Sequence, residues 1–126
     1  MLSLNKLFLI FLAGALVILA SCSNKDDDPE PRNTTDLEVV VVNELGERQS
    51  GATVNIYRLY DDYLHNNNSL GAKITNSEGK VVFTNLSAIN YYIDVVKGTL
   101  DNYSGVYKTP APITYKETTT ITIAIK

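Results

Sequence analysis

Side chains that commonly carry enzyme chemistry are scarce in this chain. Of its 126 residues, one is a histidine, His65, and one is a cysteine, Cys22. A zinc site needs three or four histidine, cysteine or acidic ligands at suitable spacing. Spacing alone does not exclude a Ser–His–Asp triad, but no serine has the surroundings of an activated nucleophile. The sequence therefore predicts no catalytic residue, no metal site and no cofactor, and leaves a hydrolase as a remote alternative.

The longest polar segment is residues 61–69, which read DDYLHNNNS. Asp61 and Asp62, together with the three asparagines that follow His65, could supply oxygen ligands for Ca²⁺. The segment lacks EF-hand spacing and the glycine that such a bend requires. We therefore expect a solvated loop in which His65 is exposed.

Eight tyrosines give the chain side chains that are suited to contacts with a ligand or partner. Tyr57, Tyr60 and Tyr92 fall on the strand phase opposite the expected core, and Tyr63 lies in the 61–69 loop. Tyrosine rings can stack on sugars or anchor protein contacts. Alternatively, these tyrosines are simply favourable on the solvent face of a sheet. The candidate contact patch comprises Tyr57, Tyr60, Asp61, Asp62, Tyr63, His65 and Tyr92, while Tyr103, Tyr107 and Tyr115 lie in or near expected loops.

The N-terminus reads as an export signal. Lys6 precedes an uncharged apolar run of 14 residues, LFLIFLAGALVILA, over 7–20. A positive start followed by such a run is typical of a secretory signal peptide, and the run is shorter than the roughly 20 residues of a membrane-spanning helix. A span extended through Ser21 and Cys22 is the alternative, but the charges from Lys25 onward end it at once. We expect residues 1–21 to be removed.

The end of this run, Leu19-Ala20-Ser21-Cys22, resembles the lipobox of bacterial lipoproteins. The resemblance implies cleavage between Ser21 and Cys22, attachment of a diacylglyceryl group to the Cys22 thiol, and acylation of the freed amine. One acyl chain binds a membrane marginally, whereas two or more anchor it stably. Because Cys22 is the single cysteine, a disulfide within the chain is also excluded. The mature protein is expected to be held at a membrane by lipid alone.

Residues 22–36 are expected to form the lipidated cysteine and a disordered acidic tether. Residues 23–36, SNKDDDPEPRNTTD, contain no hydrophobic side chain, so they cannot bury enough surface to fold. Residue 23 is Ser rather than the Asp that resembles an inner-membrane retention signal. The acids at 26–28 resemble the export signal of surface lipoproteins in some Gram-negative lineages. We expect an outer-membrane lipoprotein displayed at the surface, with the periplasmic face as the alternative if the acids only solvate the tether.

The charge pattern argues against nucleic acid as a partner. The formal net charge is −3, and residues 37–126 carry nearly balanced acids and bases without a stripe of Lys and Arg. Binding to phosphate backbones depends on such clusters.

Residues 37–126 read as one all-β domain. Short β-rich runs alternate with turn sequences, and no apolar pattern of helical period is sustained. The expected strands are 37–43, 52–60, 70–75, 80–83, 91–97, 103–108 and 117–126. About seven short antiparallel strands hide their apolar faces best as two stacked sheets, a Greek-key β-sandwich. The expected core comprises Val39, Val41, Val54, Ile56, Val81, Phe83, Leu86, Tyr91, Ile93, Val95, Ile121, Ile123 and Ile125.

Three motifs strengthen this interpretation: GATVNIY at 51–57, TNSEGKVVF at 75–83 with Leu86, and YYIDV at 91–95. Together they resemble carboxypeptidase-regulatory-like, transthyretin-like (prealbumin-like) β-sandwich domains. Their glycines make turns and their apolar residues make core, so the resemblance implies a fold rather than an activity. The ureide hydrolases that share this fold use more than one histidine and a different C-terminal tail, so their activity is not expected here. The lysine and asparagine that form an isopeptide crosslink in some related surface domains are absent from the first and last strands.

Two non-catalytic functions follow from this sequence. The first is a binding or assembly module that contacts an envelope protein or a glycan. The second is a surface spacer or subunit with no ligand. A binder should bring Tyr57, Tyr60 and Tyr92 into one exposed patch, or order residues 61–69 into a concave rim. A spacer should leave these tyrosines scattered.

Overall fold

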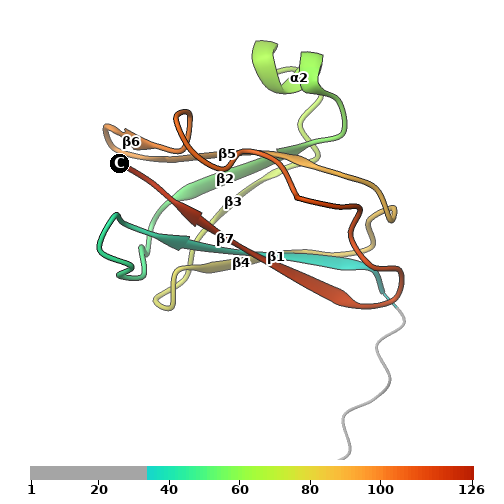
Figure 1. The fold of residues 1–126 in the computed structure, drawn as a ribbon, viewed down its shortest axis with the longest axis horizontal. Coiled ribbons are helices and arrows are strands. Elements are labelled where there is room, and N and C mark those ends of the chain that lie inside the picture. The colour runs from blue at the N-terminus through green and yellow to red at the C-terminus, as the bar shows by residue number, and fades with distance from the viewer. Residues whose placement is uncertain (1–33) are drawn as a thin grey trace, which may run out of the picture. The chain divides into compact units, whose positions relative to one another are not determined.

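The computed structural model describes residues 34–126, which form two stacked β-sheets with one short helix at the side (Figure 1). The three-stranded sheet has the order β4-β1-β7 and the four-stranded sheet the order β3-β2-β5-β6. The predicted all-β sandwich is therefore confirmed at the level of two packed sheets. The seven strands of the described residues are β1 (Asp36–Val42), β2 (Thr53–Tyr57), β3 (Ala72–Ile74), β4 (Lys80–Phe83), β5 (Tyr92–Lys97), β6 (Leu100–Asp101) and β7 (Thr118–Ala124), and the helix is α2 (Tyr60–His65).

The start of the first strand lies close to the expected end of the tether. β1 begins at Asp36, one residue before the expected boundary, and Thr35 is already buried. The Asp36 carboxylate accepts hydrogen bonds from the Thr34 hydroxyl and the Asn85 amide, at 3.0 and 3.3 Å. The expected signal peptide 1–21, Cys22 and most of the tether lie outside the described residues. Among residues 34–126, no helix is long and apolar enough to cross a membrane.

One strand pair departs from the antiparallel arrangement that the sequence predicted. β7 runs parallel to β1 in continuous register, with Val39 opposite Ile121 and Val41 opposite Ile123. The expectation that all pairs are antiparallel is wrong here because β1 and β7 are not joined by a hairpin. The chain between them passes through the whole second sheet, and such a long excursion allows a parallel pairing.

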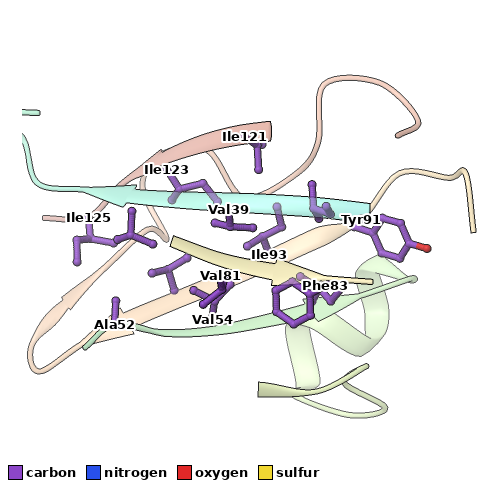
Figure 2. Packing of buried hydrophobic residues seen from close by; sticks show 14 of the residues in the cluster. Val39, Ala52, Val54, Val81, Phe83, Tyr91, Ile93, Ile121, Ile123 and Ile125 are labelled. Carbon is purple, nitrogen blue, oxygen red and sulfur yellow. The ribbon is translucent and has the colours of Figure 1, made fainter. Parts of the chain in front are cut away.

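The core lies between the two sheets and is made by alternating strand residues (Figure 2). Twelve of the thirteen expected core residues are buried, and Leu86 packs against them while partly buried. Leu37, Ala52 and Ile113 complete the cluster. Tyr91 closes one end of it: its ring is fully buried and its hydroxyl donates to the Ser87 carbonyl at 2.8 Å. The alternation of apolar residues on the strands thus predicted the core well. Ile113 was not predicted because it lies in a loop, which has no alternating pattern.

Two expected elements are different in the structure. The residues expected as a strand at 103–108 form no continuous ladder, because Asn102 occupies the edge of β5 with its side chain. Its Oδ1 accepts from the Val95 amide at 2.9 Å, and its Nδ2 donates to the carbonyls of Ile93 and Val106 at 2.8 and 2.9 Å. The chain rejoins β5 at the isolated bridge between Lys108 and Tyr92. The first half of the expected 61–69 loop is the helix α2, which lies beyond the four-stranded sheet (Figure 1).

Candidate functional site

The outer face of the four-stranded sheet carries a cluster of tyrosines beside α2. On β5, Ile93 and Val95 point into the core, so Tyr92 and Asp94 alternate onto the outer face. Antiparallel pairing places Tyr57 of β2 directly opposite Tyr92. The sheet register therefore brings aromatic side chains from two strands to one place, next to the helix that contacts both strands.

The helix adds two more rings to this place. Tyr60 and Tyr63 are three residues apart on α2, a spacing that puts them on one helical face. The Tyr60 ring centroid lies 5.5 Å from that of Tyr92, and the Tyr63 centroid lies 5.6 Å from that of Tyr107. Tyr63 also meets Tyr57 edge-on at 6.0 Å. These separations lie in the range where aromatic pairs attract one another.

Local hydrogen bonds fix the position of α2. Asn66 ends the helix in the left-handed conformation, with φ 52°, and its backbone N–H bonds to the Asp62 carbonyl. The Asn66 side chain accepts a hydrogen bond from the Tyr57 hydroxyl at 3.4 Å, and Asn68 donates to the Asp62 carboxylate at 3.1 Å. The Ser69 hydroxyl then bonds to Asn55 of β2 at 3.0 Å. Residues 61–69 are thus held against the sheet at several points.

The cluster encloses a hollow of about 450 Å³ that is open on one side. Four of its seven lining residues are tyrosines, and polar and apolar atoms contribute about equally to its surface. The lining residues are Tyr60, Tyr63, Leu64, Asn66, Asp94, Tyr103 and Tyr107.

Asp94 is the ionisable group most deeply placed in this hollow. Its side chain is only 8% exposed, and its Oδ1 has no hydrogen-bond partner. Burial raises the pKa of Asp94 above its usual 3.8, a hydrogen bond from Tyr103 opposes the shift, and the nearby charge of Asp101 adds to it. A buried carboxylate with an unused oxygen needs an explanation, because desolvating such a group without a partner is unfavourable.

The hydroxyls of Tyr57, Tyr63 and Tyr103 stay protonated at neutral pH. Burial, with the charge of Asp94 as the second cause, raises the pKa of Tyr63 to about 12. The same two causes, in the same order, raise the pKa of Tyr57 and that of Tyr103. Two of the lining residues, Tyr63 and Tyr103, therefore present neutral hydroxyl groups near the Asp94 side chain.

The structure brings part of the predicted contact patch together. Tyr60, Tyr63 and Tyr92 meet as one cluster. Tyr57 touches this cluster but is 2% exposed, so its expected place on an exposed face is wrong: α2 covers the end of β2. The rings of Tyr60 and Tyr107 remain substantially exposed.

The polar members of the predicted patch do not line the hollow. Asp61 and His65 face each other as an exposed pair, with His65 Nδ1 3.4 Å from Asp61 Oδ1. Asp62 bonds to Asn68 instead. Among residues 34–126, no three histidine, cysteine or acidic side chains gather where they could hold a metal ion.

Sequence reasoning did not select the groups that complete the site. Leu64, Asn66, Asp94, Tyr103 and Tyr107 were outside the predicted patch. One signal was available: Asp94 is an acidic residue between Tyr92 and Val96 on the outward phase of β5. The positions of Tyr103 and Tyr107 depend on how Asn102 folds the following loop, which no periodicity reveals.

Comparison with known proteins identifies the fold and nothing finer. No protein-family model matches the chain, and no curated protein matches it. Among solved structures, a streptococcal ancillary pilin superposes with a TM-score of 0.56 at 15% identity, over 81% of this chain and 33% of the pilin chain. BcpA, the major pilin subunit of Bacillus cereus, gives a TM-score of 0.51 at 14% identity, over 74% of this chain and 30% of its own. The chain therefore spans about a third of these pilins and shares a β-sandwich with them.

Proposed function

We propose that this chain is a lipid-anchored, non-catalytic binding or assembly module of the cell envelope, and that the tyrosine hollow is its contact site. The observation that carries the binding role is the hollow itself: Tyr63, Leu64 and Asn66 of the 61–69 segment form one wall, and its lining includes the buried Asp94, whose Oδ1 has no hydrogen-bond partner. A spacer without a ligand has no need of a desolvated carboxylate among exposed aromatic rings. Aromatic side chains around a desolvated polar group are also the usual composition of binding hot spots.

The fold supports an assembly role at the cell surface. The solved structures that resemble this chain include a protein named as an ancillary pilin and one named as a major pilin subunit. We infer further that the sandwich is of the carboxypeptidase-regulatory-like, transthyretin-like kind, because the motifs at 51–57, 75–83 and 91–95 resemble those of such domains. Such domains serve many functions, so the site and not the fold must carry the argument.

The anchor is proposed from the sequence of residues 19–22 alone. We expect the mature chain to begin at a lipidated Cys22 and to stand on the outer membrane, exposed at the surface, with the periplasmic face as the alternative. Mass spectrometry of the N-terminal peptide should show acyl groups on residue 22. In Cys22→Ser the protein should be released or stay unprocessed, whereas Ser23→Ala should be lipidated like wild type. An unmodified thiol in the exported chain would remove the anchor from the proposal.

A position-specific crosslink tests the contact site. A photoreactive residue replaces Tyr103, which lines the hollow and is 59% exposed, in the full chain displayed by its native host. The matched control carries the same group at Tyr115, which is 69% exposed and does not line the hollow. A discrete adduct with one envelope component at position 103 but not at 115 supports the binding module. Equal or absent adducts at both positions favour the spacer.

A further inference from the structure

We propose that the tyrosine hollow binds an organic cation, an ammonium or guanidinium group such as a lysine or arginine side chain presents. This inference rests on the proposed binding role and names the chemistry that the site recognises. Three features of the site carry it: an uncompensated carboxylate, aromatic walls free of any internal cation, and the absence of a positive group from the lining.

Asp94 has no counter-ion of its own. In the part of the chain that the structure describes, the ion pairs are His65–Asp61 and Lys80–Glu78, and neither reaches the hollow. The charged group that acts on Asp94 is Asp101, which has the same sign. Tyr103 is the hydrogen-bonding group that acts on this carboxylate, and the Oδ1 atom has no hydrogen-bond partner. A cation entering the hollow would offset the buried charge of Asp94.

The walls suit a cation as well. Ring faces attract ammonium and guanidinium groups within about 6 Å of the centroid. One ring of the cluster already contacts a cation of this chain: Lys108 Nζ lies 5.3 Å from the Tyr92 ring centroid. The other cation–ring contacts within residues 34–126 are at Phe83 and Tyr115. The rings of Tyr60, Tyr63 and Tyr107 therefore have no cation from this chain on them.

The same geometry disfavours other ligand classes. An anion would meet a carboxylate and no lysine or arginine among the lining residues. A sugar would stack on an open ring face, but Tyr63 is nearly parallel to both Tyr60 and Tyr107, at 23° and 16°, with centroids 6.1 and 5.6 Å away. These rings partly cover one another, so the free ring face is confined to the exposed parts of Tyr60 and Tyr107, a small space. A flexible chain ending in a cation fits such a space better than a flat pyranose ring.

Titration of the full mature protein in detergent micelles tests the proposal. The probes are n-butylammonium, the uncharged n-butanol of equal length, the peptide acetyl-Gly-Lys-Gly-amide and N,N′-diacetylchitobiose, all at one ionic strength. Binding is followed by backbone amide chemical shifts near Asp94 and Tyr63. We expect saturable shifts with both lysine-like cations and none with n-butanol. If the peptide binds at least as tightly as n-butylammonium, the natural ligand is a protein partner. If n-butylammonium binds more tightly than the peptide, the natural ligand is a free amine.

Variants identify the groups responsible. Asp94→Asn keeps the shape of the side chain and should weaken cation binding about tenfold or more. Tyr107→Ala should weaken it about threefold or more, and the matched control Tyr115→Ala should bind like wild type. Circular dichroism confirms that each variant is folded. If Asp94→Asn misfolds, the difference in cation affinity between Tyr107→Ala and Tyr115→Ala tests the proposal by itself.

Four outcomes overturn the cation assignment. Two concern the other probes: equal binding of n-butanol and tighter binding of chitobiose. Two concern the cations: no saturable shift at all, and cation binding that Asp94→Asn and Tyr107→Ala leave unchanged. None of these outcomes bears on the binding role itself, which the crosslink at position 103 tests separately. The two proposals can therefore fail independently.

Discussion

The side chain of Asn102 lies along the backbone of Val95 as a neighbouring strand would. Its Oδ1 accepts from the Val95 amide at 2.9 Å, and the residue is 1% exposed. Its Nδ2 donates to two carbonyls, those of Ile93 and Val106. One buried amide thus satisfies both a donor and an acceptor on the edge of β5 and shapes the loop that carries Tyr103 and Tyr107.

Replacement of Asn102 by alanine should destabilise the domain strongly. The change leaves the Val95 amide and two carbonyls without their partners, and each unsatisfied buried group costs about 1–3 kcal/mol. We expect a loss of about 2–4 kcal/mol in the free energy of unfolding, measured by urea denaturation. Asn67→Ala is the control, because Asn67 is exposed and only its backbone is hydrogen bonded. A loss equal to that of the control would show that water replaces the amide.

Asp94→Asn should stabilise the domain at neutral pH. Because burial raises the folded-state pKa of Asp94 above 3.8, the folded protein takes up a proton more readily than the unfolded chain. Stability of the wild type therefore falls as pH rises from 3.8 through the folded-state pKa, and the loss is complete above it. The advantage of the variant should be full above the folded-state pKa and shrink as the pH falls toward 3.8.

Denaturation curves at several pH values measure this difference. The groups facing Asp94 are Tyr57, Tyr63 and Tyr103, with Asp101 nearby. The tyrosine hydroxyls are neutral throughout this range, so the pH dependence reports the carboxylates. Asp101→Asn, read in parallel, separates the contribution of the neighbouring charge. A variant less stable than wild type at pH 7 would mean that the Tyr103 hydrogen bond outweighs the burial of Asp94.

Tyr63→Phe should remove one tyrosine that ionises with a pKa of about 12. Because the folded protein holds this proton more tightly than the unfolded chain, stability falls as pH rises from 10.0 toward 12. Absorbance of tyrosinate near 295 nm, compared between wild type and variant, should differ only in the most alkaline part of the titration. A difference already complete at pH 10 would place the Tyr63 hydroxyl in water.

Gly79→Ala should cost far more than Gly46→Ala. Both glycines have positive φ, 72° and 81°, so each substitution carries the strain of about 1–2 kcal/mol. A Cβ at Gly79 would lie 2.8 Å from the Val41 carbonyl oxygen and 2.9 Å from the Gln49 amide, whereas at Gly46 nothing lies within 4 Å. We expect Gly79→Ala to lose about 3 kcal/mol or more by thermal or urea unfolding. Equal losses at the two positions would show that β1 and the 48–49 segment can move aside.

Much of the sandwich could be predicted because its strands alternate. Ile121, Ile123 and Ile125 occupy every second position, and a period of two leaves one face for the core. The parallel register of β1 and β7 could not be predicted in this way, since alternation is the same for both strand directions. The helix α2 is six residues long, too short to show a helical period.

The candidate site, like the fold, has features that could be predicted from the sequence and features that could not. The sequence alone determined that most aromatic side chains are tyrosines, that the chain holds one histidine and one cysteine, and that residues 19–22 resemble a lipid-attachment motif. Only the tertiary structure decided which tyrosines meet, that Tyr57 is covered, and that Asp94 is desolvated among them. The physical reason is that periodicity specifies the face of a strand, while burial and charge depend on what another segment lays over that face. Here that segment is α2 together with the loop that Asn102 shapes.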